Sequence, residues 1–507
     1  MKYFRKTAFL LTAAAACMMC ALPARAEEPA PTVSLTIQNP SVTEHTFELY
    51  QIFSGTVNND VLENIEWGTG ITAEYKDAHP NAAAAAVALE TEEDASAFAQ
   101  TLINENALLA PDDSMTITVA PKEEATIEAM PGYYLIKDQD GSQNMEDSSY
   151  TKHILHLTSS VVVTAKISIP TIVMKTVDAN DAEETISMNA VSIPDDRWVS
   201  SADHDVNDTF AYRIECTLPS NYADYDKYSY EVRIDAEPGI TLQDDFTVAT
   251  TSDDGIIQDI TSFFTNDVNA NNSIANVSID DLKKVSVLNS DKKLFVYGTA
   301  MLNNSAETGT VANTISATVT YTNDPNLGED TAVTSPSRVK VFTHALVVHK
   351  YGDHKGEAYR LPGAAFTLYK ELEGGKVTKV ASSKASTEEA DTIFRGIDDG
   401  KYILVEDTAP AGYNKMDSSV EYNGKTYENA TEITLEAVHD TEGVNPALRS
   451  SSINGTGTSM PGVFEMDVID HSGKMMPMTG GRGTKMITAA GIAVIILGLL
   501  GLKKRKD

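Results

Sequence analysis

The sequence FRGIDDGKYILVE, residues 394–406, is an apolar strand pattern that follows a turn rich in Gly and Asp and ends in a glutamate. A second apolar segment, Ala345–Lys350, stands before it. Short apolar runs separated by turn residues are typical of strands. The stretch 343–475 is therefore predicted to be a β-rich unit. Its polar excursion ends in a Ser- and Gly-rich segment, 450–459, which is predicted to be a mobile loop.

Residues 168–342 show a different pattern, with short alternating segments separated by Asn, Asp and Gly. Tyr230–Ile234 and Ser316–Tyr321 are examples of these segments. Alternation of apolar and polar residues over such lengths, with regular turn signals, predicts a β-sandwich.

Residues 27–167 mix strand-like runs, such as Val33–Ile37 and Thr46–Phe53, with an alanine-rich and acidic stretch. Ala82–Ala86 and Glu92–Leu109 have good helix propensity and are predicted to form two helices. This part is therefore predicted to be an α+β module, and the whole chain is predicted to be mainly β with three domains.

Both ends of the chain carry export signals. Basic residues precede an apolar stretch at 8–22, and Ala24-Arg25-Ala26 is a small-x-small cleavage site, so residues 1–26 are expected to be a signal peptide. At the other end an apolar run, 486–502, is long enough to span a thin bilayer, and the basic cluster behind it would stay cytoplasmic.

The residues before that run are Met476-Pro477-Met478-Thr479-Gly480. Together with the apolar run and the basic tail, they resemble the cell-wall sorting signal of Gram-positive bacteria, in which Met476 would replace the usual Leu. The resemblance implies that residues 476–507 are a sorting signal, and that a sortase thiol attacks the carbonyl of Thr479.

Composition excludes several classes of function. The formal net charge is −34 at pH 7, which argues against nucleic acid as a partner. Only Cys216 lies outside the leader, so an exported form could make no intrachain disulfide and would need another covalent link for durability.

The stretch Leu361–Tyr369, the stretch 394–406 and the segment Asp407–Asn414 together resemble the collagen-adhesin B-type domains of sortase-assembled pilins. The whole chain resembles the backbone pilins of that system. The resemblance implies tandem Ig-like, collagen-adhesin-type β-sandwiches, each with a Lys of its first strand bonded covalently to an Asn or Asp of its last. It also places an acid beside that pair.

The chemistry of such a bond follows from burial. A lysine amine attacks a carboxyl or carboxamide carbon only when it is unprotonated, and burial lowers the pKa of an amine. Burial raises the pKa of a neighbouring carboxylic acid, which can then remain protonated and shuttle a proton to the leaving group. The reaction needs no cofactor and occurs once per domain.

For the C-terminal domain the resemblance implies a bond between Lys350 and Asp470, promoted by Glu406. Asp470 stands where the family more often has Asn, so water would leave in place of ammonia. A satisfied Asp at a strand end is the alternative.

For the middle domain it implies a bond between Lys175 and Asn323. Asp208 matches the family position of the promoting acid best, and Glu215 and Asp205 are alternatives.

Polymerisation would need a further lysine. The resemblance assigns it to Lys166, although Thr164-Ala165 replaces the family's Tyr-Pro before it. An ordinary solvated lysine at this position, or an exchange of roles with Lys175, are the alternatives.

Enzyme motifs are lacking: no nucleophile elbow, zinc-protease motif, phosphate-binding glycine loop or Cys/His metal spacing occurs in the sequence. The acidic run 178–184 lacks the Gly and terminal Glu of an EF-hand loop and is interpreted as a solvated turn. No cofactor, metal or enzymatic turnover is therefore predicted.

The resulting hypothesis is a backbone pilin, anchored to the cell wall. Its expected partners are other copies of itself, a pilus sortase, a housekeeping sortase, peptidoglycan and a host surface ligand. A monomeric wall-anchored adhesin or pilus-base subunit is the main alternative, and a surface hydrolase on a pilin-like stalk is a remote one.

Overall fold

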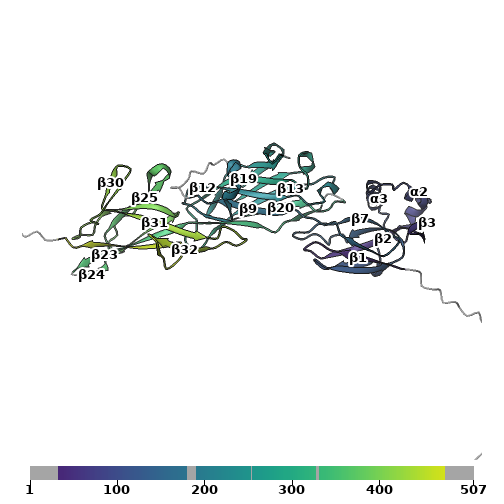
Figure 1. Ribbon diagram of the computed structural model, residues 1–507, viewed down its shortest axis with the longest axis horizontal. Helices are drawn as coiled ribbons and strands as arrows, with labels where there is room; N and C mark the ends of the chain where they lie inside the picture. Colours follow the sequence, from purple (N-terminus) through teal and green to yellow (C-terminus); the bar gives the residue numbers. More distant parts are fainter. Residues whose placement is uncertain (1–31, 180–189, 253, 327–329, 355, 474–507) are drawn as a thin grey trace, which may run out of the picture. The chain divides into compact units, whose positions relative to one another are not determined.

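The computed structural model describes residues 32–179, 190–252, 254–326, 330–354 and 356–473. The chain divides into two compact units. One is built from residues up to Ser142 together with Thr151–Lys166, and the other from Gln143–Tyr150 and the chain from Ile167 onward. Strands predominate in both units (Figure 1), which confirms the predicted mainly β fold class.

The first unit contains two sheets. Its strands are β1 (Val33–Gln38), β2 (His45–Asn58), β3 (Val61–Trp67), β4 (Thr116–Val119), β5 (Glu124–Ala129), β6 (Gly132–Asp138), β7 (Lys152–Leu157) and β8 (Val161–Thr164). One sheet has the order β3-β2-β6-β7 with β4 also paired to β2, and the other has the order β5-β1-β8. Alternate residues of β1 and β2, such as Leu35 and Phe47, are buried, as the alternating pattern predicts.

Among the described residues, α-helices occur only in this unit. They are α1 (Ala73–Ala78), α2 (Ala82–Val87), α3 (Glu92–Asn104) and the 3-10 turn η1 (Asp113–Met115). Figure 1 shows α2 and α3 on the same side of the strands. The Asn81 side chain caps α2, and a capping box between Thr91 and Asp94 starts α3. Both predicted helices are confirmed, but α3 ends at Asn104 and α1 was not predicted.

The middle stretch of the second unit forms a β-sandwich. Its elements are β9 (Ile172–Val177), η2 (Ala190–Ser192), η3 (Asp195–Arg197), β10 (Trp198–Val199), β11 (Ser201–Asp203), β12 (Thr209–Thr217), η4 (Tyr222–Asp224), β13 (Tyr230–Ala236), β14 (Ile240–Leu242), β15 (Thr247–Thr251), β16 (Ile257–Asp259), η5 (Thr261–Phe263), β17 (Thr265–Val268), β18 (Ile274–Ile279), η6 (Leu282–Lys284), β19 (Lys293–Leu302), β20 (Asn313–Thr322), β21 (Thr331–Val333) and β22 (Ser337–Phe342). One sheet has the order β10-β9-β12-β19-β15-β16, with β14 on β19. The other has the order β11-β22-β20-β13-β18-β17, with β21 on β20.

The remainder of this unit is also built from strands. They are β23 (His344–His354), β24 (Glu357–Arg360), β25 (Ala365–Leu372), β26 (Lys376–Ser382), β27 (Asp391–Ile397), β28 (Gly400–Thr408), β29 (Ser419–Tyr422), β30 (Lys425–Glu428), β31 (Ala430–His439), β32 (Leu448–Ile453), β33 (Thr456–Gly457) and β34 (Val463–His471), with the turn η7 (Glu373–Gly375). The sheets have the orders β24-β23-β27, with β34 on β23, and β26-β25-β28-β31-β32-β33, beside the hairpin β29-β30.

The prediction of a loop at 450–459 is wrong. Most of this segment belongs to β32 and β33, which extend the six-stranded sheet beyond β31. Hydrogen bonds to the neighbouring strand hold these polar residues in place, and Leu448 and Ile453 bury the apolar ends of β32. A polar strand such as β32 needs neighbouring strands to pair with, and the composition of the segment does not reveal those neighbours.

The middle sandwich and the C-terminal part of the second unit have separate hydrophobic clusters. The cluster of the middle sandwich includes Tyr212 and Val232, one from each sheet. The cluster of the C-terminal part includes Leu346, Phe366 and Leu404, again from both large sheets. Lys350 belongs to the strand that contributes Leu346 and Val348, so its side chain enters the C-terminal core.

Candidate crosslink sites

The parallel pairing of β23 with β34 brings Lys350 and Asp470 together. Lys350 lies opposite Val468, and Asp470 follows two residues later on the same face of β34. The lysine Nζ contacts the Asp470 carboxylate directly, and their side chains are 1% and 0% exposed. The two predicted partners, 120 residues apart in sequence, are therefore in contact in the C-terminal core.

Glu406 reaches the same point from β28 of the other sheet. Its Oε1 lies 3.2 Å from Lys350 Nζ, and its Oε2 accepts a hydrogen bond of 2.8 Å from the Met416 backbone N–H. Burial raises the pKa of Glu406, and the negative charge of Asp470 adds to the effect, whereas the Met416 hydrogen bond and Lys350 oppose it. The residue is therefore suited to hold a proton beside the lysine–aspartate pair.

The polar atoms of this triad are poorly satisfied. Apart from the two ion pairs, Lys350 Nζ, Glu406 Oε1 and both carboxylate oxygens of Asp470 have no hydrogen-bond partner within the described residues. Charges buried with so few partners are costly, because desolvation is not repaid by hydrogen bonds. Conversion of the ammonium and the carboxylate to a neutral amide would remove both charges.

The middle stretch of the second unit places its predicted partners differently. Lys175 is only partly buried, and its Nζ donates to Ser200 Oγ at 3.0 Å and pairs with Glu442, whose side chain is 73% exposed. Asn323 is fully buried just beyond β20, and its Nδ2 donates to the backbone carbonyl of Gln143 at 2.8 Å.

Strand register separates Lys175 from Asn323. The Ser200 carbonyl accepts from the Lys340 N–H, and Lys340 lies opposite Thr314. Asn323 follows Thr314 by nine residues along an extended strand, or about 30 Å at roughly 3.3 Å per residue. The predicted Lys175–Asn323 crosslink is therefore not supported by the structure.

The predicted promoting acid is also displaced. Lys175 lies opposite Arg213 on β12, whereas Asp208 precedes Arg213 by five residues, just before that strand begins. Of its two alternatives, Glu215 pairs with Lys293 and Asp205 contacts Lys370. The Lys175 ammonium instead contacts Ser200 and Glu442.

A second buried lysine was missed by the sequence analysis. Lys370 on β25 is 1% exposed, and its Nζ lies 2.6 Å from Asp205 Oδ2 and 3.4 Å from Asp398 Oδ2. Burial raises the pKa of Asp398 well above its usual value, and Asp203 adds to the effect. The alternation of residues along β25 could have predicted the burial of Lys370. Lys370 lies on the same face of the strand as Phe366 and Leu368, which are both buried.

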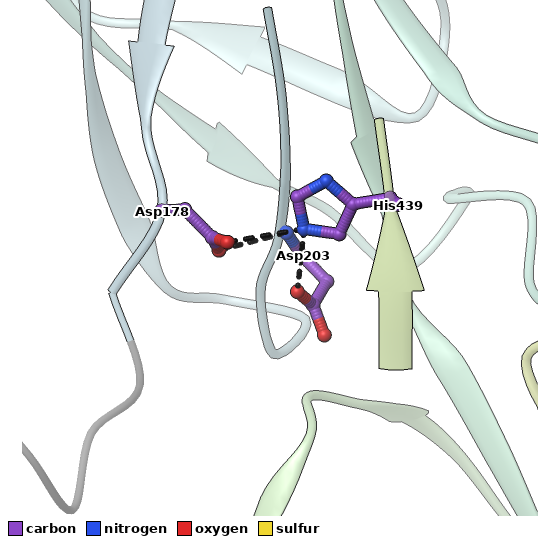
Figure 2. A group of neighbouring side chains, drawn as sticks. All are labelled: Asp178, Asp203 and His439. Atoms are coloured by element: carbon purple, nitrogen blue, oxygen red, sulfur yellow. Dashed lines mark hydrogen bonds and ion pairs between the residues drawn. The ribbon is translucent and has the colours of Figure 1, made fainter. Parts of the chain in front are cut away.

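Charged side chains from the middle and C-terminal stretches meet beside Lys370. Asp178, Asp203 and His439 form one such group (Figure 2). Burial lowers the pKa of the His439 imidazole, but its hydrogen bonds to the two aspartates outweigh this and raise the pKa to about 10. Burial alone would raise the pKa of Asp203, yet its hydrogen bonds with His344 and His439 hold it well below its usual value.

The remaining predicted residues concern assembly. Lys166 is exposed two residues after β8 ends. The predicted sortase motif, Met476 to Gly480, and the predicted membrane segment, 486–502, lie outside the described residues. Within the part of the chain that is described, no helix is long and apolar enough to cross a membrane.

Comparison with known proteins bears on this fold. Residues 344–438 match the SpaA family model, a prealbumin-like fold domain. The matched stretch contains Lys350 and Glu406 of the triad. No curated protein sequence matches the chain.

Solved structures match over nearly the whole chain. The T6 backbone pilin of serotype M6 Streptococcus pyogenes, described as a modular three-domain structure, aligns with a TM-score of 0.53 and 16% identity, over 88% of this chain and 100% of that one. The major pilin SpaD of Corynebacterium diphtheriae aligns with a TM-score of 0.47 and 14% identity, over 88% and 98% of the two chains. The chain therefore shares the fold of the T6 backbone pilin.

Proposed function

We propose that this protein is the structural backbone subunit of a covalently polymerised pilus on the cell wall of a Gram-positive bacterium. The observation that carries the proposal is the likeness in fold to the T6 backbone pilin over 88% of the chain. The match of residues 344–438 to a prealbumin-like pilin domain supports it.

An internal amide bond between Lys350 and Asp470 is the second part of the proposal. The neutral Nζ attacks Cγ of the protonated Asp470 carboxyl group, a C–N bond forms, and the carboxyl OH leaves as water after it takes up one proton from the amine. Glu406 carries the proton from the amine to the leaving oxygen, so the atoms balance without an external reagent. The bond would join the first and last strands of the C-terminal domain and let it resist pulling.

Assembly is the third part. A sortase would cleave the chain after Thr479 and hold it as a thioester, which the amine of Lys166 in another copy would resolve into an amide. Exposure of Lys166 supports this role, since an attacking amine must reach a second protein. Transfer to a wall precursor by a housekeeping sortase would end the polymer at peptidoglycan.

Substitution of these residues in cells that carry the cognate sortases tests the proposal. Lys166→Ala should abolish the SDS-resistant ladder of high-molecular-weight species while single subunits remain wall-linked, and Thr479→Ala should abolish both. Lys401→Ala, which removes another exposed lysine, is the matched control and should leave the ladder intact.

Three results would contradict parts of the proposal. A ladder that persists in Lys166→Ala and disappears in Lys175→Ala would show that the two lysines exchange roles. A ladder that survives both substitutions would place the linking amine elsewhere. Absence of a ladder in the wild type would instead favour the monomeric adhesin or the pilus-base subunit.

A further inference from the structure

Three side chains that are distant in sequence converge at one point of the second unit. Asp178 directly follows β9, Asp203 ends β11 and His439 ends β31, as Figure 2 shows. The Nε2 atom of His439 lies 3.0 Å from Asp178 Oδ2 and 3.3 Å from Asp203 Oδ1. One imidazole nitrogen therefore faces two carboxylates from another part of the chain.

The orientation of the His439 ring is set by its other nitrogen. Nδ1 lies 2.7 Å from Ser201 Oγ, and Ser201 Oγ donates its single proton to the carbonyl of Asp440. The serine oxygen must then accept the Nδ1 proton. A neutral ring in this tautomer directs a lone pair at two carboxylates, which is unfavourable unless a proton or a metal ion lies between them.

The spacing of the three atoms suits a small metal ion. A tetrahedral zinc ion with bonds of about 2.0–2.2 Å holds neighbouring ligand atoms about 3.3–3.5 Å apart. The measured separations of 3.0 and 3.3 Å need to widen by only a few tenths of an ångström. One imidazole nitrogen with two carboxylate oxygens is also a ligand set that zinc accepts, whereas calcium prefers oxygen ligands throughout.

The surrounding groups hold the ligands in place. Asp203 Oδ2 accepts from His344 Nε2 at 2.8 Å and from the Asp399 N–H at 3.2 Å, which leaves Oδ1 directed at His439. Such outer contacts are typical of metal sites, where they fix the orientation of each ligand.

The site is buried on one side and open on the other. The side chains of His439 and Asp203 are each 4% exposed, whereas that of Asp178 is 36% exposed. The exposed side of Asp178 therefore gives solvent access to the site, from which a water molecule could supply a fourth ligand. Two further carboxylates, those of Asp398 and Asp399, lie close to Asp203.

We propose that Asp178, Asp203 and His439 form a binding site for a divalent transition-metal ion, with zinc as the best fit. Two ligands come from the middle stretch and one from the C-terminal stretch, so a bound ion would link the two stretches. The site is independent of the Lys350–Glu406–Asp470 triad, and the sequence analysis predicted no metal.

Titration of the untagged, purified protein with zinc chloride in a calorimeter tests this proposal. The wild type should bind one zinc ion per chain at this site. His439→Gln and Asp178→Asn should each weaken that binding by about 100-fold or more, since loss of even an outer-shell partner costs 10- to 100-fold. His349→Gln is the matched control, because His349 faces a single carboxylate, Asp391, and should leave zinc binding unchanged.

Cobalt substitution gives a second readout. Co²⁺ at the site should show the visible absorption of a tetrahedral ion in the wild type and in His349→Gln, and lose it in His439→Gln. Asp178→Asn changes a partly exposed side chain, so it tests the site even if His439→Gln does not fold. Equal zinc binding by the wild type and by Asp178→Asn, or none in the wild type, would overturn the proposal and leave a proton-mediated contact.

Discussion

Lys350 and Lys175 look alike in sequence but differ in the folded protein. Each follows a run of apolar residues in a strand near the start of its part of the chain. Lys350 is buried between two carboxyl groups in a hydrophobic core, whereas Lys175 is partly exposed and pairs with Ser200 and Glu442. An apolar run thus places a lysine on a strand without specifying which residue it meets.

The difference arises from how the strand that carries or precedes each proposed partner lies relative to the first strand of its part. In the C-terminal part, β34 runs parallel to β23 in the same sheet, which aligns Asp470 with the Lys350 side chain. In the middle part, β20 belongs to the sheet opposite β9, and Asn323 lies beyond its far end. A crosslink can form only where strand pairing places the lysine amine and the carboxyl or amide group of its partner in contact.

The largest expected effect is that of Lys350→Ala. The wild-type protein should weigh one water less than its sequence, and this variant should show no such loss. The bond would close a loop of more than 100 residues, so its removal should lower the free energy of unfolding by about 5 kcal/mol in the chain-entropy model. Intact-mass spectrometry and thermal unfolding measure the two effects. If the well-folded wild type has the mass of its sequence, Lys350 forms no amide bond, and the proposed difference between Lys350 and Lys175 in crosslinking is wrong.

Glu406→Gln should have a smaller effect on stability but the same effect on mass. Without the acid the amide does not form and the same loop is opened, yet Lys350 keeps its contact with Asp470, so the loss should be somewhat below the value of about 5 kcal/mol expected for Lys350→Ala. Urea unfolding and intact mass report the outcome. Glu442→Gln, which changes the exposed partner of Lys175, is the control. If Glu406→Gln still loses water, the role assigned to Glu406 is wrong.

Lys175→Ala should have the smallest effect. It removes a partly exposed ion pair, which is worth less than about 1 kcal/mol, and should leave the mass deficit of the wild type unchanged. The same mass and unfolding measurements apply. A wild type that has lost ammonia as well as water, with the ammonia restored by Lys175→Ala, would mean that Lys175 does form a crosslink and that the two lysines are alike after all.

Local sequence patterns predicted many of the elements. Alternation identified β13 and β20, and helix propensity identified α2 and α3. The same reasoning missed α1 and mistook the polar strand β32 for a loop, because pairing with β31 holds β32 in place.

The residues of the candidate site were predicted from the resemblance to sortase-assembled pilins, which implied the Lys350–Asp470 pair with Glu406 as its acid. Lys350, Glu406 and Asp470 each end or follow an apolar run, and the structure brings them together. Lys370 and His439 were not identified, since their partners, Asp205 and Asp203, lie in another part of the chain.

The sequence by itself determined which segments become strands, which residues of each strand face inward, and which side chains have the chemistry for a crosslink. These properties depend on neighbours within a few residues, where periodicity and propensity act. The tertiary structure decided that Lys350 contacts Asp470, a pair that the family resemblance implied but no local pattern showed. It also decided that Lys175 does not contact Asn323 and that His439 faces Asp178 and Asp203. Those contacts depend on strand order and register over more than 100 residues, which the packing of whole sheets determines.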